Sequence, residues 1–260
     1  MNITSKDNRL LKLVKKLHQR KERKENNLFI IEGEKLIKEA ITEKLSIPYL
    51  FYKDNITNVL NNSPDTEVFT ISQSLMESIS TTDSAPPYLA VAEIFKNDYE
   101  NLKDTSLLLV VSELQDPGNF GTIIRTAEAT GVDCIIATKG TVDLYNPKVV
   151  RGSMGSIFRQ KIIYVDNISE IINDLKDFQI IMTTPYTDKN FYDIDYKNKT
   201  IIFMGNEGQG IDKDLLDKYQ GVKIPMLGKV ESLNTSIATS IILYEAVRQK
   251  NNPDCSSKTK

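Results

Sequence analysis

The second half of the chain contains six short runs of almost uninterrupted apolar residues. Each run is four or five residues long, which suits a strand and is too short for a helix, and helical patterns separate most of the runs. The runs cover residues 107–111, 134–137, 161–164, 179–182, 200–203 and 221–224. Strands that are apolar on both faces are typical of a parallel sheet covered by helices on both sides. The residues from 107 onward therefore predict an α/β domain with a parallel sheet.

Residues 28–95 predict a second and smaller α/β unit. Short apolar runs alternate there with helical patterns, which predicts strands at 29–31, 49–52, 68–70 and 88–92 and a helix at 34–44. The stretch 96–106 is polar and lacks a clear period, so it predicts a linker. The last helix is expected from about 235 to 250, and the polar residues after it predict a disordered tail.

The first 24 residues form a strongly basic leader. They hold nine Lys or Arg residues against Asp7 and Glu22, so this segment carries +7 and the rest of the chain carries −9 of the net −2. An apolar stripe recurs at helical spacing, at Leu10, Leu13, Val14 and Leu17. Two interpretations of this amphipathic helix stay open: its cationic face contacts nucleic-acid phosphates, or the helix is solvated and packs on its own protein.

Several classes of protein are disfavoured by the composition. No stretch approaches the ~18 apolar residues of a membrane span, and the first residues lack the apolar core of a signal peptide. The two cysteines, Cys134 and Cys255, make no disulfide framework and fit a reducing, cytoplasmic compartment. With one histidine, His18, the sequence cannot form a metal site from a cluster of Cys and His residues. A Ser-His-Asp triad would have to use His18, which lies in the basic leader. We therefore expect a cytoplasmic protein without a metal or a membrane anchor.

Three polar loops follow apolar runs of the second half. They are the segment 116–125, the glycine-rich segment 205–210, and the segment 224–234. In an open α/β sheet, ligands bind outside the carboxyl ends of the strands. The three loops therefore predict one composite site for a polar ligand.

The first loop carries Asn119, Gly121 and Arg125. Asn119 can cap the following helix, Gly121 permits a close backbone approach, and a cation near a helix N-terminus is well placed to hold a phosphate. The alternative for this loop alone is that Asn119 is only a cap and Arg125 only a surface cation.

The second loop has the spacing Gly-x-x-Gly-x-Gly, which does not match the dinucleotide fingerprint or a P-loop. A tight turn is the alternative, but Glu207 is a carboxylate between glycines at a strand end, which favours ligand contact. In the third loop, Ser232 and Asn234 suit either a helix cap or a ligand. The apolar Ile224 and Met226 beside them would suit the faces of an adenosine.

Together the three segments resemble the signature motifs of the SpoU (TrmH-like) family of RNA ribose 2′-O-methyltransferases, in the SPOUT superfamily. The resemblance rests on Asn-x-Gly-x-x-x-Arg at 119–125, Gly-x-Glu-Gly-x-Gly at 205–210, and Ile-Pro-Met with Ser-Leu-Asn at 224–234. Asn146-Pro-Lys148 with Arg151-Gly-Ser153-x-Gly155 is similar to the family's middle segment. The front half resembles the family's substrate-binding domain, which is similar to ribosomal protein L30e.

The resemblance implies four segments. These are a basic helical leader at 1–26, an L30e-like RNA substrate-binding domain at 27–96, a SpoU-type methyltransferase domain with a trefoil knot at 105–250, and a disordered tail at 251–260. It also implies a homodimer and S-adenosylmethionine as methyl donor. Carried onto matching positions, the catalytic set is Asn119, Arg125, Glu207 and Asn234. The cofactor-binding set is Gly205, Ile224, Met226, Ser232 and Leu233.

The implied reaction is methyl transfer to a ribose 2′-hydroxyl, whose proton must leave during attack. An ordinary Arg stays protonated, so Arg125 is expected either to hold a phosphate and the hydroxyl in line or to stabilise charge developing on oxygen. Glu207 or an RNA phosphate is expected to accept the proton. The two-domain layout resembles that of the family's ribosomal RNA enzymes more than that of its compact tRNA enzymes, which implies ribosomal RNA as substrate. Housekeeping and antibiotic-resistance methylation both stay open. A tRNA methyltransferase and a non-catalytic RNA-binding protein stay open, whereas the glycine spacing argues against a nucleotide-dependent oxidoreductase.

Overall fold

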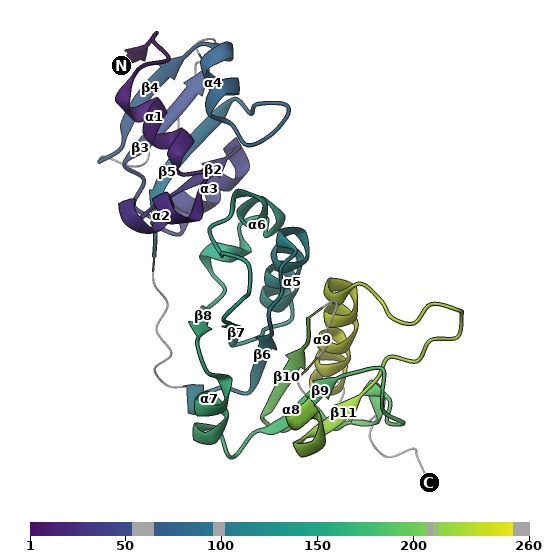
Figure 1. The fold of residues 1–260 in the computed structure, drawn as a ribbon. Helices are drawn as coiled ribbons and strands as arrows, with labels where there is room; N and C mark the ends of the chain where they lie inside the picture. Colours follow the sequence, from purple (N-terminus) through teal and green to yellow (C-terminus); the bar gives the residue numbers. More distant parts are fainter. Residues whose placement is uncertain (54–64, 96–101, 207–210, 212, 252–260) are drawn as a thin grey trace. The chain divides into compact units, whose positions relative to one another are not determined.

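The computed structural model describes residues 1–53, 65–95, 102–206, 211 and 213–251. The chain divides into two compact units (Figure 1). Unit 1 comprises Met1–Lys96 and Asp143–Arg159, and unit 2 comprises Asn97–Val142 and Gln160–Lys260. Most of the expected linker at 96–106 and nearly all of the expected tail lie outside the described residues.

Unit 1 is built on a five-stranded sheet with the order β1-β4-β3-β5-β2. β5 runs antiparallel to both of its neighbours, and the other pairs are parallel. The strands are β1 (Asn2–Ile3), β2 (Leu28–Glu32), β3 (Tyr49–Lys53), β4 (Glu67–Ile71) and β5 (Tyr88–Glu93). The helices are α1 (Arg9–Lys16), α2 (Arg20–Asn26), α3 (Glu34–Thr42), α4 (Gln73–Ile79), α6 (Pro147–Gly152) and the short η2 (Ser156–Phe158). The expected α/β character of the front half is confirmed.

The basic leader folds as two helices rather than one, and it belongs to unit 1 rather than standing apart. Leu11, Val14 and Leu17 are fully buried in the core of this unit. Arg23, from α2, donates hydrogen bonds to the carbonyls of Leu17 and His18 at 2.8 and 2.9 Å. These carbonyls lie just past the end of α1, where backbone oxygens lack helical partners, so Arg23 stabilises the break between α1 and α2.

Residues 143–159 were expected within the methyltransferase domain but fold as part of unit 1. Tyr145 packs against both Phe29 and Phe95, with ring centroids 4.8 and 5.5 Å away, and its hydroxyl donates to the Phe95 carbonyl. α6 lies against β2. The domain division expected from the sequence therefore differs from the observed units at this segment.

Two ion pairs also hold residues 143–159 to the rest of unit 1. Arg23 donates to Asp143 at 2.5 and 2.9 Å, and Arg151 donates to Glu32 at 2.7 Å. The Glu32 carboxylate is almost fully buried, and it also accepts hydrogen bonds from Ser80 and Thr81. A buried carboxylate with this many donors is well compensated for the loss of water.

Unit 2 is built on a six-stranded sheet in which every strand pair is parallel, with the order β11-β9-β10-β6-β7-β8. The strands are β6 (Leu107–Val111), β7 (Cys134–Thr138), β8 (Ile162–Val165), β9 (Gln179–Thr183), β10 (Thr200–Met204) and β11 (Gln220–Val222). The helical elements are η1 (Leu102–Asp104), α5 (Pro117–Ala129), α7 (Ile168–Asp174), η3 (Phe191–Asp193), α8 (Lys213–Lys218) and α9 (Thr235–Asn251). This confirms the expected parallel sheet.

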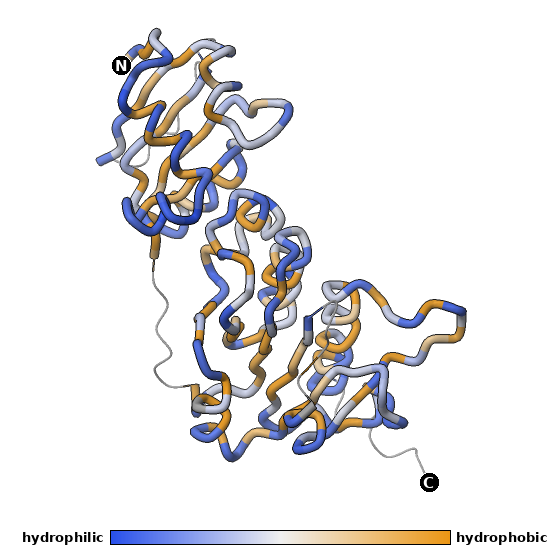
Figure 2. The backbone as a smooth tube through the Cα atoms, viewed as in Figure 1, coloured by the Kyte–Doolittle hydropathy of each residue, from blue (hydrophilic) through white to orange (hydrophobic). Residues whose placement is uncertain are grey.

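The central strands of unit 2 are buried on both faces. All residues of β6, β7 and β10 are buried, and Figure 2 shows these strands as mainly hydrophobic. α5 and α9 pack against each other. No helix in the described part of the chain is long and apolar enough to cross a membrane.

Candidate active site

The three motif loops leave the sheet of unit 2 at one edge. They follow β6, β10 and β11, and all strands of this sheet are parallel, so the loops start at the same carboxyl edge. The second loop is bonded to the stretch between β6 and the first loop, since the Asn206 amide donates to the Glu113 carbonyl at 2.9 Å. The Ser112 N–H also donates to the Met204 carbonyl at 2.9 Å. These bonds tie the start of the second loop to the residues that lead into the first, and one composite site of all three loops stays a prediction.

Asp116, and not Asn119, caps α5. The Asp116 carboxylate accepts a hydrogen bond from the backbone N–H of Asn119 at 2.7 Å, and Pro117 occupies the first helical position. The interpretation of Asn119 as a mere N-cap is therefore wrong. Its side chain serves another purpose.

The side chain of Asn119 is bonded to the third motif. Its Oδ1 accepts from Asn234 Nδ2 at 2.9 Å and from Ser236 Oγ at 3.3 Å. Asn234 precedes α9 and caps it, because its Oδ1 accepts from the backbone N–H groups of Ser236 and Ile237. The packing of α5 on α9 thus brings together two predicted catalytic residues that are 115 positions apart in the sequence.

Arg125 lies in the middle of α5 with its side chain exposed. Six residues of helix separate it from Asn119, which places it about 9 Å further along the axis and about 120° around it. No hydrogen bond or ion pair links the Arg125 guanidinium to any residue that the structure describes. The structure therefore presents Arg125 as an exposed cation on another side of α5 from Asn119, and not bonded to the Asn119–Asn234 pair.

The predicted cofactor residues lie on the second and third loops. Gly205, Ile224, Met226 and Leu233 are half-buried, and Ser232 is exposed without a hydrogen bond to another described residue. The chain runs from β11, at the edge of the sheet, to α9 beside α5, and residues 227–232 between them are exposed on a loop that projects from unit 2 (Figure 1). Glu207 lies outside the described residues.

Sequence reasoning missed two polar contacts at this edge, those of Ser236 and Asn206. Ser236 is almost fully buried, and its hydroxyl bonds to both Asn119 and Asn234. The sequence does hold one indication of the Ser236 contact. Ser236 lies two residues after Asn234, which can cap a helix, and a short polar side chain at that distance can reach the capping residue. Asn206 lies inside the glycine-rich motif, but nothing in its spacing indicated a bond to Glu113, just after β6.

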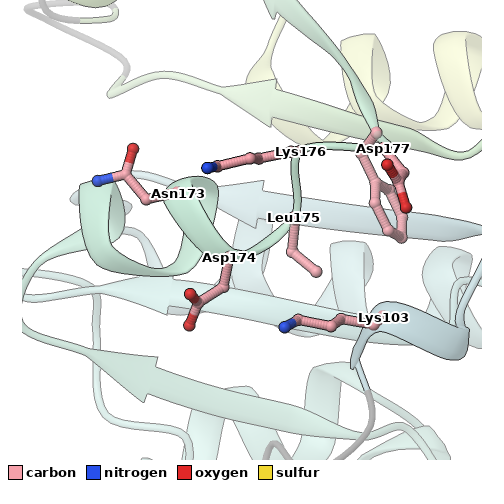
Figure 3. Close-up of a pocket in the computed structure, with 7 residues that line it drawn as sticks. Lys103, Asn173, Asp174, Leu175, Lys176 and Asp177 are labelled. Carbon is pink, nitrogen blue, oxygen red and sulfur yellow. The ribbon is translucent and has the colours of Figure 1, made fainter.

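A shallow pocket in unit 2 does not coincide with the motif residues (Figure 3). It is lined by Lys103, Asn173, Asp174, Leu175, Lys176, Asp177 and Phe178. These residues precede β6 and β9, so they lie toward the amino ends of the strands. The lining holds two lysines and two aspartates, so its net charge gives no attraction for an anion.

Cysteine chemistry is disfavoured in the strands of unit 2. Cys134 begins β7 and is fully buried. Burial raises the pKa of the Cys134 thiol to about 12, so the thiol stays protonated at neutral pH. Cys134 is therefore a packing residue rather than a nucleophile.

Both the front and the second half of the chain match known protein families. Residues 106–244 match the model of the SpoU rRNA Methylase family, and residues 8–90 match the MRM3-like substrate binding domain. The second match includes most of the basic leader, in agreement with its packing in unit 1. The chain is 31% identical to the 23S rRNA (guanosine(2553)-2′-O)-methyltransferase RlmP of Bacillus subtilis, over 93% of this chain and 97% of the relative.

Solved structures agree with this assignment. The AdoMet-bound rRNA methyltransferase from Sinorhizobium meliloti is 30% identical, with a TM-score of 0.85 over 96% of this chain and 98% of that one. The SpoU methyltransferase AviRb from Streptomyces viridochromogenes, in complex with AdoMet, is 26% identical, with a TM-score of 0.85 over 94% of this chain and 99% of that one. The chain therefore belongs to the SpoU rRNA methylase family.

Proposed function

We propose that this protein methylates a ribose 2′-hydroxyl of ribosomal RNA, and that Asn119, Arg125, Glu207 and Asn234 perform the reaction. Membership of the SpoU family makes it an RNA 2′-O-ribose methyltransferase that uses S-adenosylmethionine. The observation that carries the proposed site is the Asn119–Asn234 hydrogen bond at the carboxyl edge of the sheet. The name of the Bacillus subtilis relative supports 23S rRNA as the class of substrate.

Two of the catalytic residues orient the substrate. The amides of Asn119 and Asn234 are fixed by each other and by the start of α9, so they offer preorganised polar groups. Arg125 remains protonated and holds a phosphate of the RNA next to the reacting ribose, or stabilises charge developing on the 2′-oxygen. Glu207 or an RNA phosphate accepts the proton of the 2′-hydroxyl.

The methyl donor is proposed to bind against Gly205, Ile224, Met226, Ser232 and Leu233. When bound, S-adenosylmethionine supplies an electrophilic methyl group on a sulfonium. Three of these residues are apolar and only half-buried, which suits contact with the faces of an adenine. Gly205 directly follows β10 and lets a ligand approach the backbone closely. The residues present therefore fit such a donor.

The remaining features of the family are also proposals for this chain. They are a trefoil knot in the C-terminal part of unit 2, a homodimer, a reaction that uses no metal, and action in the cytoplasm. The homodimer is supported by an apolar stripe on α9, where Ile237 and Tyr244 are 52% and 55% exposed. Unit 1 is proposed to dock the RNA, because its residues match a substrate-binding domain and its leader presents exposed cations.

A methyl-transfer assay with two classes of RNA tests the proposed function. Purified protein and tritiated S-adenosylmethionine are incubated with total ribosomal RNA, with tRNA, or without RNA. Tritium is expected in ribosomal RNA alone, and mapping 2′-O-methyl sites in cells with and without the gene should identify the nucleotide. Transfer of tritium to tRNA alone would show that tRNA, and not ribosomal RNA, is the substrate. Binding of S-adenosylmethionine without transfer to either RNA would contradict the catalytic role.

A further inference from the structure

A fourth loop leaves the carboxyl edge of the unit 2 sheet. It comprises residues 184–190 and follows β9, which lies between β10 and β11 in the sheet. All strands of this sheet are parallel, so this loop begins between the second and third motif loops, which follow β10 and β11. None of the residues proposed for catalysis or for binding the methyl donor belongs to it.

The start of this loop is fixed against β11. The Thr184 N–H donates to the Val222 carbonyl at 2.9 Å, and the Thr187 hydroxyl donates to the Gly221 carbonyl at 3.4 Å. A Cβ atom at Gly221 would lie 3.2 Å from Thr184 Cγ2 and 3.4 Å from Thr187 Cβ. Because glycine has no Cβ, both threonines pack closely on the backbone of this strand.

The end of the loop is fixed beside the residue that follows β11. The Lys223 N–H donates to the Lys189 carbonyl at 2.9 Å, and the Phe191 N–H donates to the Lys223 carbonyl at 2.8 Å. The buried Tyr196 then donates its hydroxyl to the Phe191 carbonyl at 2.9 Å. The loop is therefore held at both ends, and its end lies one residue from Ile224 of the proposed donor-binding set.

Tyr186 lies within this anchored loop and is 90% exposed. Its backbone is held as well, since the Tyr186 N–H donates to the Thr184 hydroxyl at 3.2 Å. A single exposed apolar residue is ordinary on a protein surface. This one, however, is carried by a backbone fixed at the edge of the sheet that holds the motif loops, and packing on its own unit does not account for the ring. An aromatic side chain held in this way loses little conformational freedom when it contacts a flat ligand.

We propose that the ring of Tyr186 stacks on an unpaired base of the RNA substrate and helps to hold the target ribose at the carboxyl edge. This inference rests on the proposed function of the same edge. Unpaired RNA bases are commonly recognised by stacking on aromatic side chains. The adenine of the methyl donor fits this ring less well, because the apolar residues proposed to bind the donor are half-buried and Tyr186 is almost fully exposed.

Stacking, rather than charge, is the contact that this loop offers. Asp188 and Asp193 offset Lys189 and Lys223, so the loop and its anchoring residues carry no net charge. Every base has a flat aromatic face, so such a contact needs no particular base. Loss of the ring should therefore weaken RNA binding without changing its dependence on salt, which phosphate contacts determine.

Substitutions of Tyr186 test this role against a matched control. Tyr186→Ala removes the ring, Tyr186→Phe keeps it, and Tyr186→Leu keeps apolar volume without an aromatic face. We expect Tyr186→Ala and Tyr186→Leu to raise the KM for ribosomal RNA about 10-fold, the effect of one stacked base, and Tyr186→Phe to stay near wild type. Tyr192→Ala should keep the KM, because the 49% exposed Tyr192 already packs its ring on Phe191, with centroids 5.2 Å apart.

The Kd for S-adenosylmethionine and the salt slope of RNA binding should be unchanged in Tyr186→Ala. An unchanged KM in this variant, an equal rise in Tyr192→Ala, or a wild-type KM in Tyr186→Leu would each overturn the proposal. A weaker Kd for S-adenosylmethionine in Tyr186→Ala would overturn it too, because the ring would then serve the adenine of the donor.

Fluorescence gives a readout that does not depend on catalysis. The chain contains no Trp, so Tyr186→Trp places one indole at this position and none elsewhere. Ribosomal RNA added without the methyl donor should quench this fluorescence by stacking, whereas Tyr192→Trp should keep its fluorescence. Quenching of Tyr186→Trp by S-adenosylmethionine alone would overturn the assignment of the ring to RNA.

The same readout separates this inference from the proposed function. Quenching of Tyr186→Trp by RNA, together with a wild type that transfers no methyl group, would support the stacking contact and count against the proposed function alone. Methyl transfer by the wild type, together with unquenched Tyr186→Trp that still retains RNA in filter binding, would overturn the stacking contact alone.

Discussion

At the scale of single residues, Asn234 makes two structural contacts with one side chain. Its oxygen caps α9, while its nitrogen bonds to Asn119 on α5. A carboxylate would cap the helix equally well, but it has no hydrogen to donate to Asn119. The requirement for both a donor and an acceptor therefore favours an amide at this position.

Arg125 is the residue whose removal should separate binding from chemistry. Arg125→Ala is expected to keep its Kd for S-adenosylmethionine, because Arg125 is exposed on α5 and is not among the proposed donor-binding residues. Methyl transfer should fall at least 100-fold if Arg125 has either proposed role, holding a phosphate beside the ribose or stabilising charge on the 2′-oxygen. Calorimetry and the tritium assay measure the two quantities. Near-normal transfer would remove Arg125 from the catalytic set.

At the scale of elements, unit 1 is held together by side chains from distant segments. Arg23 is 3% exposed, and it bonds to the end of α1 and to Asp143 in the segment 143–159. Tyr145 and Arg151 add an aromatic contact and a second ion pair from the same segment. Unit 1 therefore depends on residues that the chain supplies from within the stretch matched by the SpoU model.

Arg23→Met should destabilise the protein by about 3 kcal/mol, because a partly buried Asp143 loses its charge partner. The next residue offers a control. Lys24 is exposed on the same helix, and Lys24→Met removes the same charge at an expected cost within about 0.5 kcal/mol. Urea unfolding of the full chain measures both free energies. If both substitutions lower the free energy of unfolding equally, the buried contacts of Arg23 do not contribute more to stability than the exposed charge of Lys24.

The end of α9 carries a pH-dependent contact. Arg248 donates two hydrogen bonds to Glu245, at 2.7 and 2.8 Å, and holds the pKa of that carboxyl below its usual value. A carboxyl with a depressed pKa stabilises the fold above its unfolded pKa of about 4.3 and loses this contribution as the pH falls through the folded value.

Glu245→Gln should therefore cost roughly 1 kcal/mol at pH 7, and the difference from wild type should shrink below about pH 4. Chemical unfolding at a series of pH values measures this. Glu67→Gln, at an exposed position on β4, should show no such difference at any pH. If the difference in the free energy of unfolding between Glu245→Gln and wild type instead stays constant down to pH 3, the lost hydrogen-bond geometry, and not the charge, is responsible.

At the scale of the whole molecule, the charge of the chain is divided between a basic leader and an acidic remainder. Eight of the nine leader cations are exposed, and Arg23 is the buried exception. The apolar side of the leader is in the core of unit 1, so both interpretations of this segment are compatible: it packs on its own protein and still presents cations. Contact of these cations with RNA phosphates stays a prediction.

Replacing Lys15, Lys16, Lys21 and Lys24 by Gln should weaken RNA binding and flatten its dependence on salt. Each phosphate contact contributes about 0.7 to 0.9 to the slope of log K against log salt, so four lost contacts would lower the slope by about 3. A variant with Gln at Lys103, Lys139, Lys176 and Lys197 changes net charge equally and should keep the slope. Filter binding to ribosomal RNA over a series of salt concentrations measures these slopes. If the leader variant and the wild type have equal slopes, the leader has only a structural role.

The proposed homodimer should depend on the exposed stripe of α9. Ile237, Ile241 and Tyr244 recur at helical spacing on one side of this helix. Changing Ile237 and Tyr244 together to Lys should convert a dimer to a monomer in sedimentation equilibrium. Tyr186→Lys, at a 90% exposed position elsewhere in unit 2, should leave the mass unchanged. A monomeric wild type would contradict the dimer outright.

The sequence by itself determined the secondary structure and the parallel sheet of unit 2, because fully apolar strands and helical periods are local patterns. It also indicated which edge would hold the site, since motif loops follow strands that must all point the same way. Only the tertiary structure decided the partners of the side chains. The pairing of Asn119 with Asn234 and Ser236 and the folding of residues 143–159 into unit 1 both depend on contacts between distant segments. Such contacts follow from the packing of one surface on another, and no periodicity along the chain records which surfaces will meet.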